Sequence, residues 1–479
     1  MKYEFYGLAD ALGLSDAQKA TIQRLLEVRR NVSSRNEVLR AYYEGNIVVK
    51  DFGVTIESNV LENDFVCHWP ERAVSSLSDR ERFDGFVFED GYTDAALNAA
   101  FLSNNLASAY RRYNDSKLMH GIMFACVNNV NGMPQVRFHS AETAWAEPDG
   151  NYDSGEVGAG IAVARYERKS WSGKRVIPTQ VNFYERGRVT VLELYDQNKW
   201  TATRYDLPHD ECMMYAFVHN STGTKPFGQS RITKAVKSLT RAAVRTTWHM
   251  ELSGAFYAMP KYAALGLTDA QFQTMIQNKP KFYLDSMMLF TRDKQGNVPE
   301  IQQFSGNSPQ PFIDELEYYA GQFCGATGVP MSSLVDTGHY TSSDAMAAAA
   351  NGLVIAAKDD IAADTFTLRK IALMMMAIAY NTTVDELTDE QKSVTAHFLD
   401  PDMPSRSQLA DSTLKNISAF PWLASTDLAL ERLGFEHADI MRVTKARDAY
   451  EASQSLNALL ERANELPQAT VDVNESIEE

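Results

Sequence analysis

Residues 121–207 differ from the rest of the chain because strand signals follow one another there without an intervening helix. The segment opens with two apolar runs on either side of Asn131-Gly132, a dipeptide typical of a tight hairpin turn. Runs rich in β-branched and aromatic residues follow, with short polar breaks such as Arg186-Gly187 between them. The pattern predicts a hairpin followed by an antiparallel meander of about four strands. Because helices are expected elsewhere, the predicted fold class is α+β.

Helical signals lie on both sides of this strand-rich segment. Near the start, apolar residues recur at helical spacing and Ser15 is placed to cap the helix. Beyond the strands, an Ala-rich stretch of about ten turns predicts one long helix, with Asp359 and Asp360 on its solvated face. The predicted helices cover about 15–46, 70–86, 95–121, 228–252, 310–326 and 342–380, with several shorter ones in 404–465.

The sequence lacks the motifs that carry common catalytic chemistry. The Gly173-Lys174 pair has neither the upstream Gly nor the following Ser or Thr of a phosphate-binding loop. There is no HExxH, no GxSxG and no zinc-deaminase signature. The cluster at 209–212, His-Asp-Glu-Cys, falls at a strand–loop junction, where adjacent side chains point to opposite faces. We therefore expect no enzyme, no catalytic residue, no cofactor and no metal. An α+β enzyme with an unrecognised active site is the alternative.

A basic segment stands out in an acidic chain. The 46 Lys and Arg residues are outnumbered by 62 Asp and Glu residues, which gives a formal net charge of −16. Yet residues 230–245 hold five cations, and no Asp or Glu occurs in 212–250. At about 100° per residue the cations share one side of a helix, opposite an apolar side. These cations are Arg231, Lys234, Lys237, Arg241 and Arg245. Such a stripe is typical of a solvated helix face, or of a face directed at phosphates or at an acidic neighbouring subunit.

The remaining composition is that of an ordinary globular chain. The four cysteines are scattered and are expected to be small buried apolar side chains. The longest strongly apolar run, 371–380, is far shorter than the roughly 20 residues needed to span a bilayer, so no membrane association is predicted. Residues 466–479 are acidic and are predicted to be disordered.

Four stretches, taken in order, resemble the portal proteins of long-tailed bacteriophages. The first is VCHWPERAVSSLSDRERFDGF at 66–86. The second, within 225–266, has a Gly-x-Ser-Arg-Ile helix start and a later Pro-x-Tyr-x-x-x-Gly stretch. The third, within 319–360, has Gly-x-Pro-x-x-x-Leu, a short loop, and Ser-Ser-x-Ala opening a long Ala-rich helix. The fourth is the helical stretch 407–443. Together they cover most of the chain.

The resemblance implies a portal-type subunit with a wing, a helical stem, a clip, a tunnel loop and a helical crown. The implied segments are the wing at 1–228, a stem helix at 229–255, the clip at 256–308, a second stem helix at 309–327, the tunnel loop at 328–341, a long wing helix with its following segment at 342–403, the crown at 404–465 and the acidic tail at 466–479. In the tunnel loop, the residues implied to form turns or approach DNA are Pro330, Met331, Gly338, His339 and Tyr340.

The implied function is a ring of about twelve subunits at one capsid vertex, through which double-stranded DNA passes during packaging and ejection and to which the tail is joined. The implied partners are other copies of the chain, DNA, a terminase motor, a head–tail adaptor, the major capsid protein and a scaffold protein. The protein would reside in the virion, and in the host cytoplasm during assembly. In the ring, the basic stripe would meet either DNA or acids of the next subunit such as Asp314, Glu315 and Glu317, and both interpretations stay open.

Overall fold

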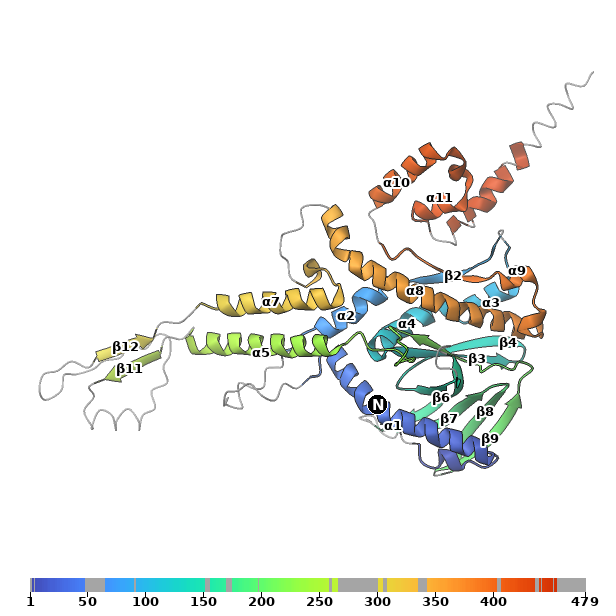
Figure 1. Ribbon diagram of the computed structural model, residues 1–479, viewed down its shortest axis with the longest axis horizontal. Helices are drawn as coiled ribbons and strands as arrows, with labels where there is room; N and C mark the ends of the chain where they lie inside the picture. Colours follow the sequence, from blue (N-terminus) through green and yellow to red (C-terminus); the bar gives the residue numbers. More distant parts are fainter. Residues whose placement is uncertain are drawn as a thin grey trace, which may run out of the picture. The chain divides into compact units, whose positions relative to one another are not determined.

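The computed structural model of the 479-residue chain is a mixture of helices and strands that form two compact units, Met1–Pro401 and Asp402–Glu479 (Figure 1). The structure describes residues 2–3, 5–47, 65–89, 92–150, 156–168, 175–196, 198–257, 261–265, 300–304, 308–334, 343–402, 406–435, 439–440, 442–450 and 452–454. The α+β class predicted from the sequence is confirmed, because most neighbouring strands are antiparallel and the helices are grouped apart from them.

The largest sheet contains the predicted meander. Strands β5 (Ala144–Pro148), β6 (Val157–Arg168), β7 (Arg175–Glu185), β8 (Arg188–Asp196) and β9 (Lys199–Asp206) are hydrogen-bonded in sequence order, and each pair is antiparallel. The short β1 (Lys2–Tyr3) pairs with β7 in parallel. The four-strand meander corresponds to β6–β9, whereas β5 was not predicted as a separate strand.

A second sheet has the order β10-β3-β4. Its strands are β3 (Ile122–Val130), β4 (Met133–Ser140) and β10 (Met214–Val218). The turn between β3 and β4 has Asn131 at φ 55° and Gly132 at φ 82°, the two positive angles that a type I′ hairpin requires. The predicted hairpin is therefore confirmed. Two short sheets complete the set: β2 (Phe83–Val87) pairs with β13 (Thr395–Phe398), and β11 (Lys261–Leu265) pairs with β12 (Glu300–Phe304).

Most of the predicted helices are present. Helix α1 (Asp16–Tyr43) begins with a capping box in which Ser15 and Gln18 exchange hydrogen bonds. The segment predicted as one helix at 95–121 is instead two, because Asn105 adopts a left-handed conformation with φ 46°. The other helices are α2 (Trp69–Ser78), α3 (Ala95–Ser103), α4 (Leu106–His120), α5 (Lys234–Tyr257), α7 (Gln310–Thr327), α8 (Ser343–Tyr380) and α9 (Asp389–Lys392).

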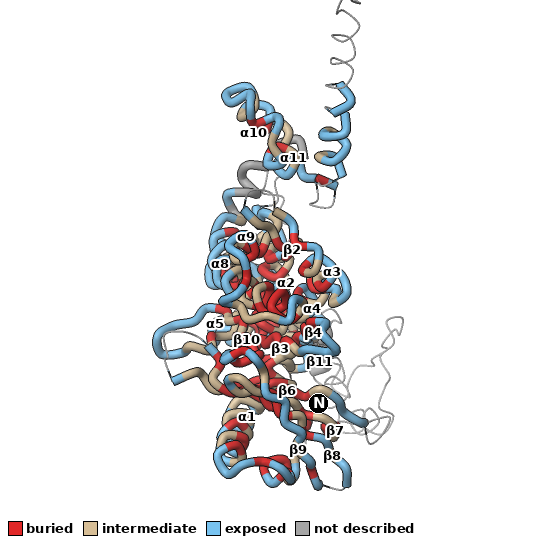
Figure 2. The backbone as a smooth tube through the Cα atoms, turned by 90° about the vertical axis from the view of Figure 1, so that its right-hand side faces the viewer, coloured by how far each residue is buried: buried red, intermediate tan, exposed pale blue. Residues whose placement is uncertain are grey.

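The core of the first unit lies where helices cover the two larger sheets. Helices α4 and α8 pack on the β10-β3-β4 sheet, and Tyr110, Phe217 and Met375 are fully buried among them. Helix α1 covers the β5–β9 sheet, with Ile22 and Leu25 buried there. Figure 2 shows the buried residues concentrated around α2, α4, β3 and β10. Apolar burial of this kind is the main stabilising contribution to such a unit.

Helices α5 and α7 leave this core together as an arm. They lie side by side and run in opposite directions, with the paired strands β11 and β12 at their far end (Figure 1). Ala243 and Val244 of α5 and Leu316 and Ala320 of α7 line one cavity of about 640 Å³. The sides of the two helices that carry these four residues therefore face the same space.

The second unit is small and helical. It contains α10 (Arg406–Ala419), a 3-10 helix η5 (Pro421–Ser425) and α11 (Asp427–Arg432), with Leu423 and Ala429 buried among them. Short helices were predicted in this region, and their presence is confirmed. Across all the described ranges, no helix is both long and apolar enough to cross a bilayer.

Candidate functional site: the root and basic face of α5

The Gly-x-Ser-Arg-Ile sequence forms the root of α5, an irregular segment that precedes the helix. Gly228 has φ +75°, and a Cβ there would lie 2.4 Å from the Gly121 carbonyl oxygen and 2.5 Å from that of His219. The backbone N–H of Gln229 donates to the same His219 carbonyl at 2.9 Å. Only glycine satisfies both the positive φ and the close approach of two backbone oxygens.

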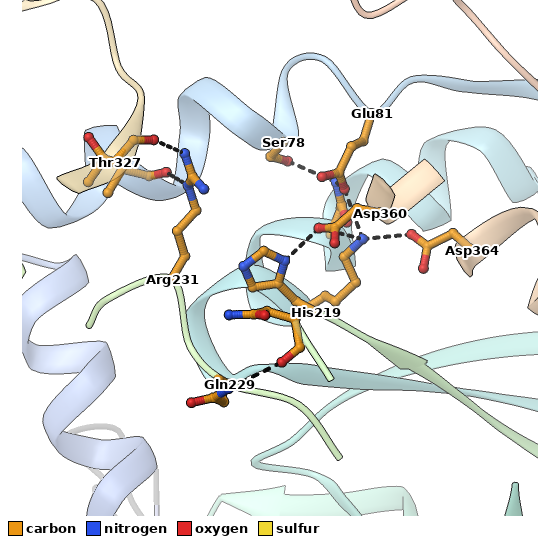
Figure 3. A network of polar contacts seen from close by, with 12 residues as sticks. Ser78, Glu81, His219, Gln229, Arg231, Thr327, Asp360 and Asp364 are labelled. Atoms are coloured by element: carbon orange, nitrogen blue, oxygen red, sulfur yellow. Dashed lines mark hydrogen bonds and ion pairs between the residues drawn. The ribbon is translucent and has the colours of Figure 1, made fainter. Parts of the chain in front are cut away.

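Ser230 and Arg231 attach this root to three helices. The Ser230 hydroxyl donates to the Met119 carbonyl of α4 at 2.5 Å. The Arg231 guanidinium donates through Nη2 to the Thr327 carbonyl at 2.6 Å and through Nε to the Ala73 carbonyl of α2 (Figure 3). Thr327 is the last residue of α7, so its carbonyl is one that the helix itself leaves unpaired. Burial lowers the pKa of Arg231, and Glu81 and Asp360 oppose that effect.

The helix therefore starts at Lys234, later than predicted, and the assignment of Arg231 to the basic stripe was wrong. Residues 229–233 lie outside α5 because their backbone and side chains are bonded to α4, α2 and α7. The guanidinium of Arg231 is directed at two carbonyl groups inside the unit. Counting 100° per residue grouped Arg231 with the other cations because it treats the whole segment as helix, including the residues before the helix begins.

The other four cations do share one face of α5, which we call the basic face: Lys234, Lys237, Arg241 and Arg245. At about 100° per residue they fall within an arc of about 80°. Three of them are exposed and Lys237 is half-buried. None of the four forms an ion pair with any residue that the structure describes. The basic face is thus a row of positive charge with no opposite charge from its own chain in the described ranges.

The predicted tunnel-loop residues are only partly within the described ranges. Pro330 lies just before the 3-10 helix η3 (Met331–Ser333), Met331 is its first residue, and both are half-buried. The Met331 sulfur lies 3.7 Å from the Cys324 sulfur of α7. Met331 thus packs against its own chain instead of extending freely. Gly338, His339 and Tyr340 lie outside the described residues.

A buried charge cluster, which was not predicted, lies beside the root. Lys117 of α4 is 0% exposed, and its Nζ lies 2.6 Å from Asp364 Oδ2 and 2.8 Å from Glu81 Oε2. Asp360 Oδ2 lies 3.8 Å from the same Nζ and 2.6 Å from His219 Nδ1 (Figure 3). Asp360 was predicted on the solvated face of the long helix, and that prediction was wrong, although Asp359 is exposed. The contacts that bury Asp360 come from α4 and the segment after β10, which local patterning cannot reveal.

The cluster holds more negative than positive charge, and burial shifts its protonation. Burial raises the pKa of Glu81 to about 8 and also raises that of Asp364. Burial alone would raise the pKa of Asp360 too, but the His219 hydrogen bond and Lys117 together lower it. Because three buried carboxyl groups surround one ammonium group, the Glu81 carboxyl group keeps its proton near neutral pH. Because the cluster is closed to solvent, it acts as a connection among α4, α8 and the segment after α2.

Within the described ranges, the charge cluster included, no group of three or more His, Cys, Asp or Glu residues is arranged to hold a metal ion. The 209–212 cluster was predicted not to bind a metal, and two of its members, His209 and Cys212, are buried. Cys126 is also buried, whereas Cys67 and Cys324 are partly exposed, and all four cysteines are free thiols. The cysteine prediction is therefore confirmed for two of the four.

We expect buried His120 to make the first unit sensitive to acid. His120 is 3% exposed, and burial, assisted by Arg35 and Arg40, lowers its pKa to about 3. In the unfolded chain a histidine titrates near pH 6.5, so the stabilising effect of keeping it neutral is present above that pH and is lost as the pH falls towards 3. At pH 5 the loss should be about 2 kcal/mol. Urea unfolding measures the free energy of unfolding at pH 7 and pH 5. The difference between the two pH values should be smaller in His120→Gln than in the wild type by about 2 kcal/mol.

His68 provides the control, because its side chain is largely exposed. The variant His68→Gln should keep the wild-type difference between pH 7 and pH 5. Equal pH effects in the wild type and His120→Gln would contradict the assignment of acid sensitivity to His120.

No protein-family model matches the chain, and no curated protein matches it. Among solved structures, it is similar to a component of the virion of a native gene transfer agent particle, with 10% identity over 81% of this chain and 89% of the other, at a TM-score of 0.43. A component of the neck of the native particle, computed with C12 symmetry, has 12% identity over 77% and 89%, at a TM-score of 0.44. A component of the neck of the empty particle, computed with C6 symmetry, has 12% identity over 73% and 84%, at a TM-score of 0.38. A likeness at this level carries no information on function.

Proposed function

We propose that this chain is a portal-type subunit that forms a ring-shaped DNA passage at one capsid vertex and serves in packaging, head–tail joining and DNA ejection. The observation that carries the proposal is the arm. Helices α5 and α7 run antiparallel from the Gly-x-Ser-Arg-Ile root and carry the paired strands β11 and β12 at their far end. The sequence resemblance implies two stem helices around a clip in these same segments. An exposed two-helix arm cannot bury its outer faces within one copy, which favours a role in assembly.

The proposal assigns the other segments by position. Residues 1–228 and 342–403 would form the wing, 328–341 the tunnel loop and 404–465 the crown. About twelve copies would surround the DNA, in contact with a terminase motor, a head–tail adaptor, the major capsid protein and a scaffold protein, in the virion and, before that, in the host cytoplasm. The role requires no catalysis, cofactor or metal, since guiding DNA depends on the shape and charge of a passage.

Electron microscopy of the purified full-length protein tests the proposal. We expect negatively stained particles to be rings with a central hole. Mass measurement by light scattering should give a closed oligomer of about twelve subunits. A protein that stays monomeric or dimeric at every salt concentration would contradict the proposed function. Nucleotide hydrolysis by the pure protein would instead favour the alternative of an enzyme.

A further inference from the structure

A second cavity of the first unit lies beside helix α8, away from the arm. Its volume is about 190 Å³, and the segments between β5 and β6, between β7 and β8 and around the start of β10 line it together with α8. At about 30 Å³ per molecule, the space would take about six water molecules or one organic group of the size of an amino-acid side chain. Its charged and hydroxyl-bearing side chains are Asp149, Glu156, Arg186, Glu211, Tyr215, Thr367 and Lys370. Which of these charges are already paired decides what the cavity can bind.

Two ion pairs account for both cations of the cavity and leave one carboxylate over. Arg186 Nη1 lies 3.5 Å from Asp149 Oδ2, and Lys370 is paired with Glu156. Glu211 is exposed, and its carboxylate has no ion-pair partner in the part of the chain that the structure describes. The cavity therefore carries an excess of one negative charge, which favours a cation over an anion as its ligand.

A buried hydroxyl group belongs to the same cavity and lacks a partner. Tyr215 is 7% exposed, and its hydroxyl oxygen has no hydrogen-bond partner among the described residues. Burial raises the pKa of Tyr215 well above its usual value, and the charges of Glu211 and Glu156 raise it further, so the hydroxyl keeps its proton at neutral pH. Thr367 Oγ1 donates to the Ala216 carbonyl at 3.4 Å, so its lone pairs can still accept. A ligand that donates hydrogen bonds would satisfy these oxygens.

The rest of the cavity is apolar. Val157 and Met214 line it and are buried. Phe366 of α8 also lines it, yet its ring is 57% exposed, and Lys370 Nζ lies 4.8 Å from the ring centre. An exposed aromatic ring beside a polar recess is suited to cover the carbon chain of a ligand whose other end is charged.

We propose that this cavity binds an alkylammonium ion, with its ammonium group at Glu211 and its short carbon chain against Met214 and Phe366. An ammonium group has three N–H donors, and the acceptors are the Glu211 carboxylate, Tyr215 Oη and Thr367 Oγ1. A metal ion is disfavoured, because the described carboxylates are not arranged to hold one. A free amine and the lysine side chain of another protein share this chemistry. All the lining residues belong to one chain, so the inference does not rest on the proposed ring.

Ligand-observed NMR on the full-length protein tests the site. The probes are n-butylammonium, whose carbon chain has the length of a lysine side chain, and n-butanol, which has the same chain without the charge. We expect saturable binding of n-butylammonium and none of n-butanol. Glu211→Gln should weaken the affinity for n-butylammonium by about tenfold or more, and Tyr215→Phe by about fivefold. Both variants should fold normally, since Glu211 is exposed and Tyr215→Phe removes a hydroxyl group without a partner among the described residues.

Glu193→Gln is the matched control, because Glu193 is exposed on β8 and does not line the cavity. This variant should bind n-butylammonium with the wild-type affinity. Tighter binding of a lysine whose two backbone ends are blocked would support the site and assign the ammonium group to another protein, whereas the reverse order would support it and assign a free amine. Wild-type affinity in Glu211→Gln, or equal binding of n-butanol, would overturn the proposal. Binding of neither amine would show that the cavity holds water alone, and would overturn it too.

Discussion

Replacing Lys117 by methionine should lower the free energy of unfolding of the first unit by about 3–5 kcal/mol. The ammonium group is fully buried and lies within 2.8 Å of both Glu81 and Asp364. Methionine would fill the space but leave the carboxyl groups buried without a cation. Removing one partner of a buried ion pair destabilises the fold strongly because the charge that remains is buried and uncompensated. Urea unfolding followed by circular dichroism measures the difference.

Two further measurements identify the cause of that loss. The exposed Lys358 of α8 gives the control, because Lys358→Met should change the unfolding free energy by less than about 0.5 kcal/mol. The deficit of Lys117→Met relative to the wild type should grow as the pH rises from 7 to 9. Burial raises the pKa of Glu81 to about 8, so the wild-type carboxyl group releases its proton in this range with Lys117 beside it. Without the ammonium group the folded variant keeps that proton to higher pH, and it therefore loses more stability than the wild type as the pH rises. A deficit that is constant from pH 7 to pH 9 would contradict the electrostatic explanation.

The substitution Gly228→Ala should destabilise the first unit by about 2–4 kcal/mol. Alanine would have to adopt φ +75° with its Cβ 2.4 Å from one backbone oxygen and 2.5 Å from another. Neither oxygen can move without breaking the contacts of α4 or of the segment after β10. Gly223 lies five residues earlier, has no atom within 4 Å of an added Cβ, and serves as the matched control. Gly223→Ala should unfold at the wild-type urea concentration, and the same result for Gly228→Ala would show that the root tolerates a side chain.

The contrast between the basic face and the root shows what the sequence could predict. Runs of β-branched and aromatic residues and Asn131-Gly132 identify strands because the determinants are local, and the same holds for the capping of α1 by Ser15. Lys234, Lys237, Arg241 and Arg245 were grouped correctly because the helix period alone decides which residues share a face. Arg231 was misplaced because its partners are carbonyl groups of Ala73 and Thr327, far away in sequence.

The charge cluster was missed for a related reason. Asp360 and Asp364 are four residues apart on α8, so their shared face was visible in the sequence. Whether that face meets water or Lys117 depends on how α4 packs against α8, and nothing in the spacing of either helix specifies this. Buried ion pairs are rare enough that two acids on an Ala-rich helix are ordinarily expected in solvent.

The root of α5 also has a mechanical consequence. Helix α5 has 24 residues and is about 36 Å long, so a sideways force at the β11–β12 end acts on the root through a long lever. The bending moment falls on a few short bonds around Ser230 and Arg231. Because Arg231 binds a carbonyl group in the middle of α2 and the carbonyl group at the end of α7, twisting the arm would load α2 and α7 as well as α5. An arm held in this way behaves as a stiff cantilever that transmits torque into the core.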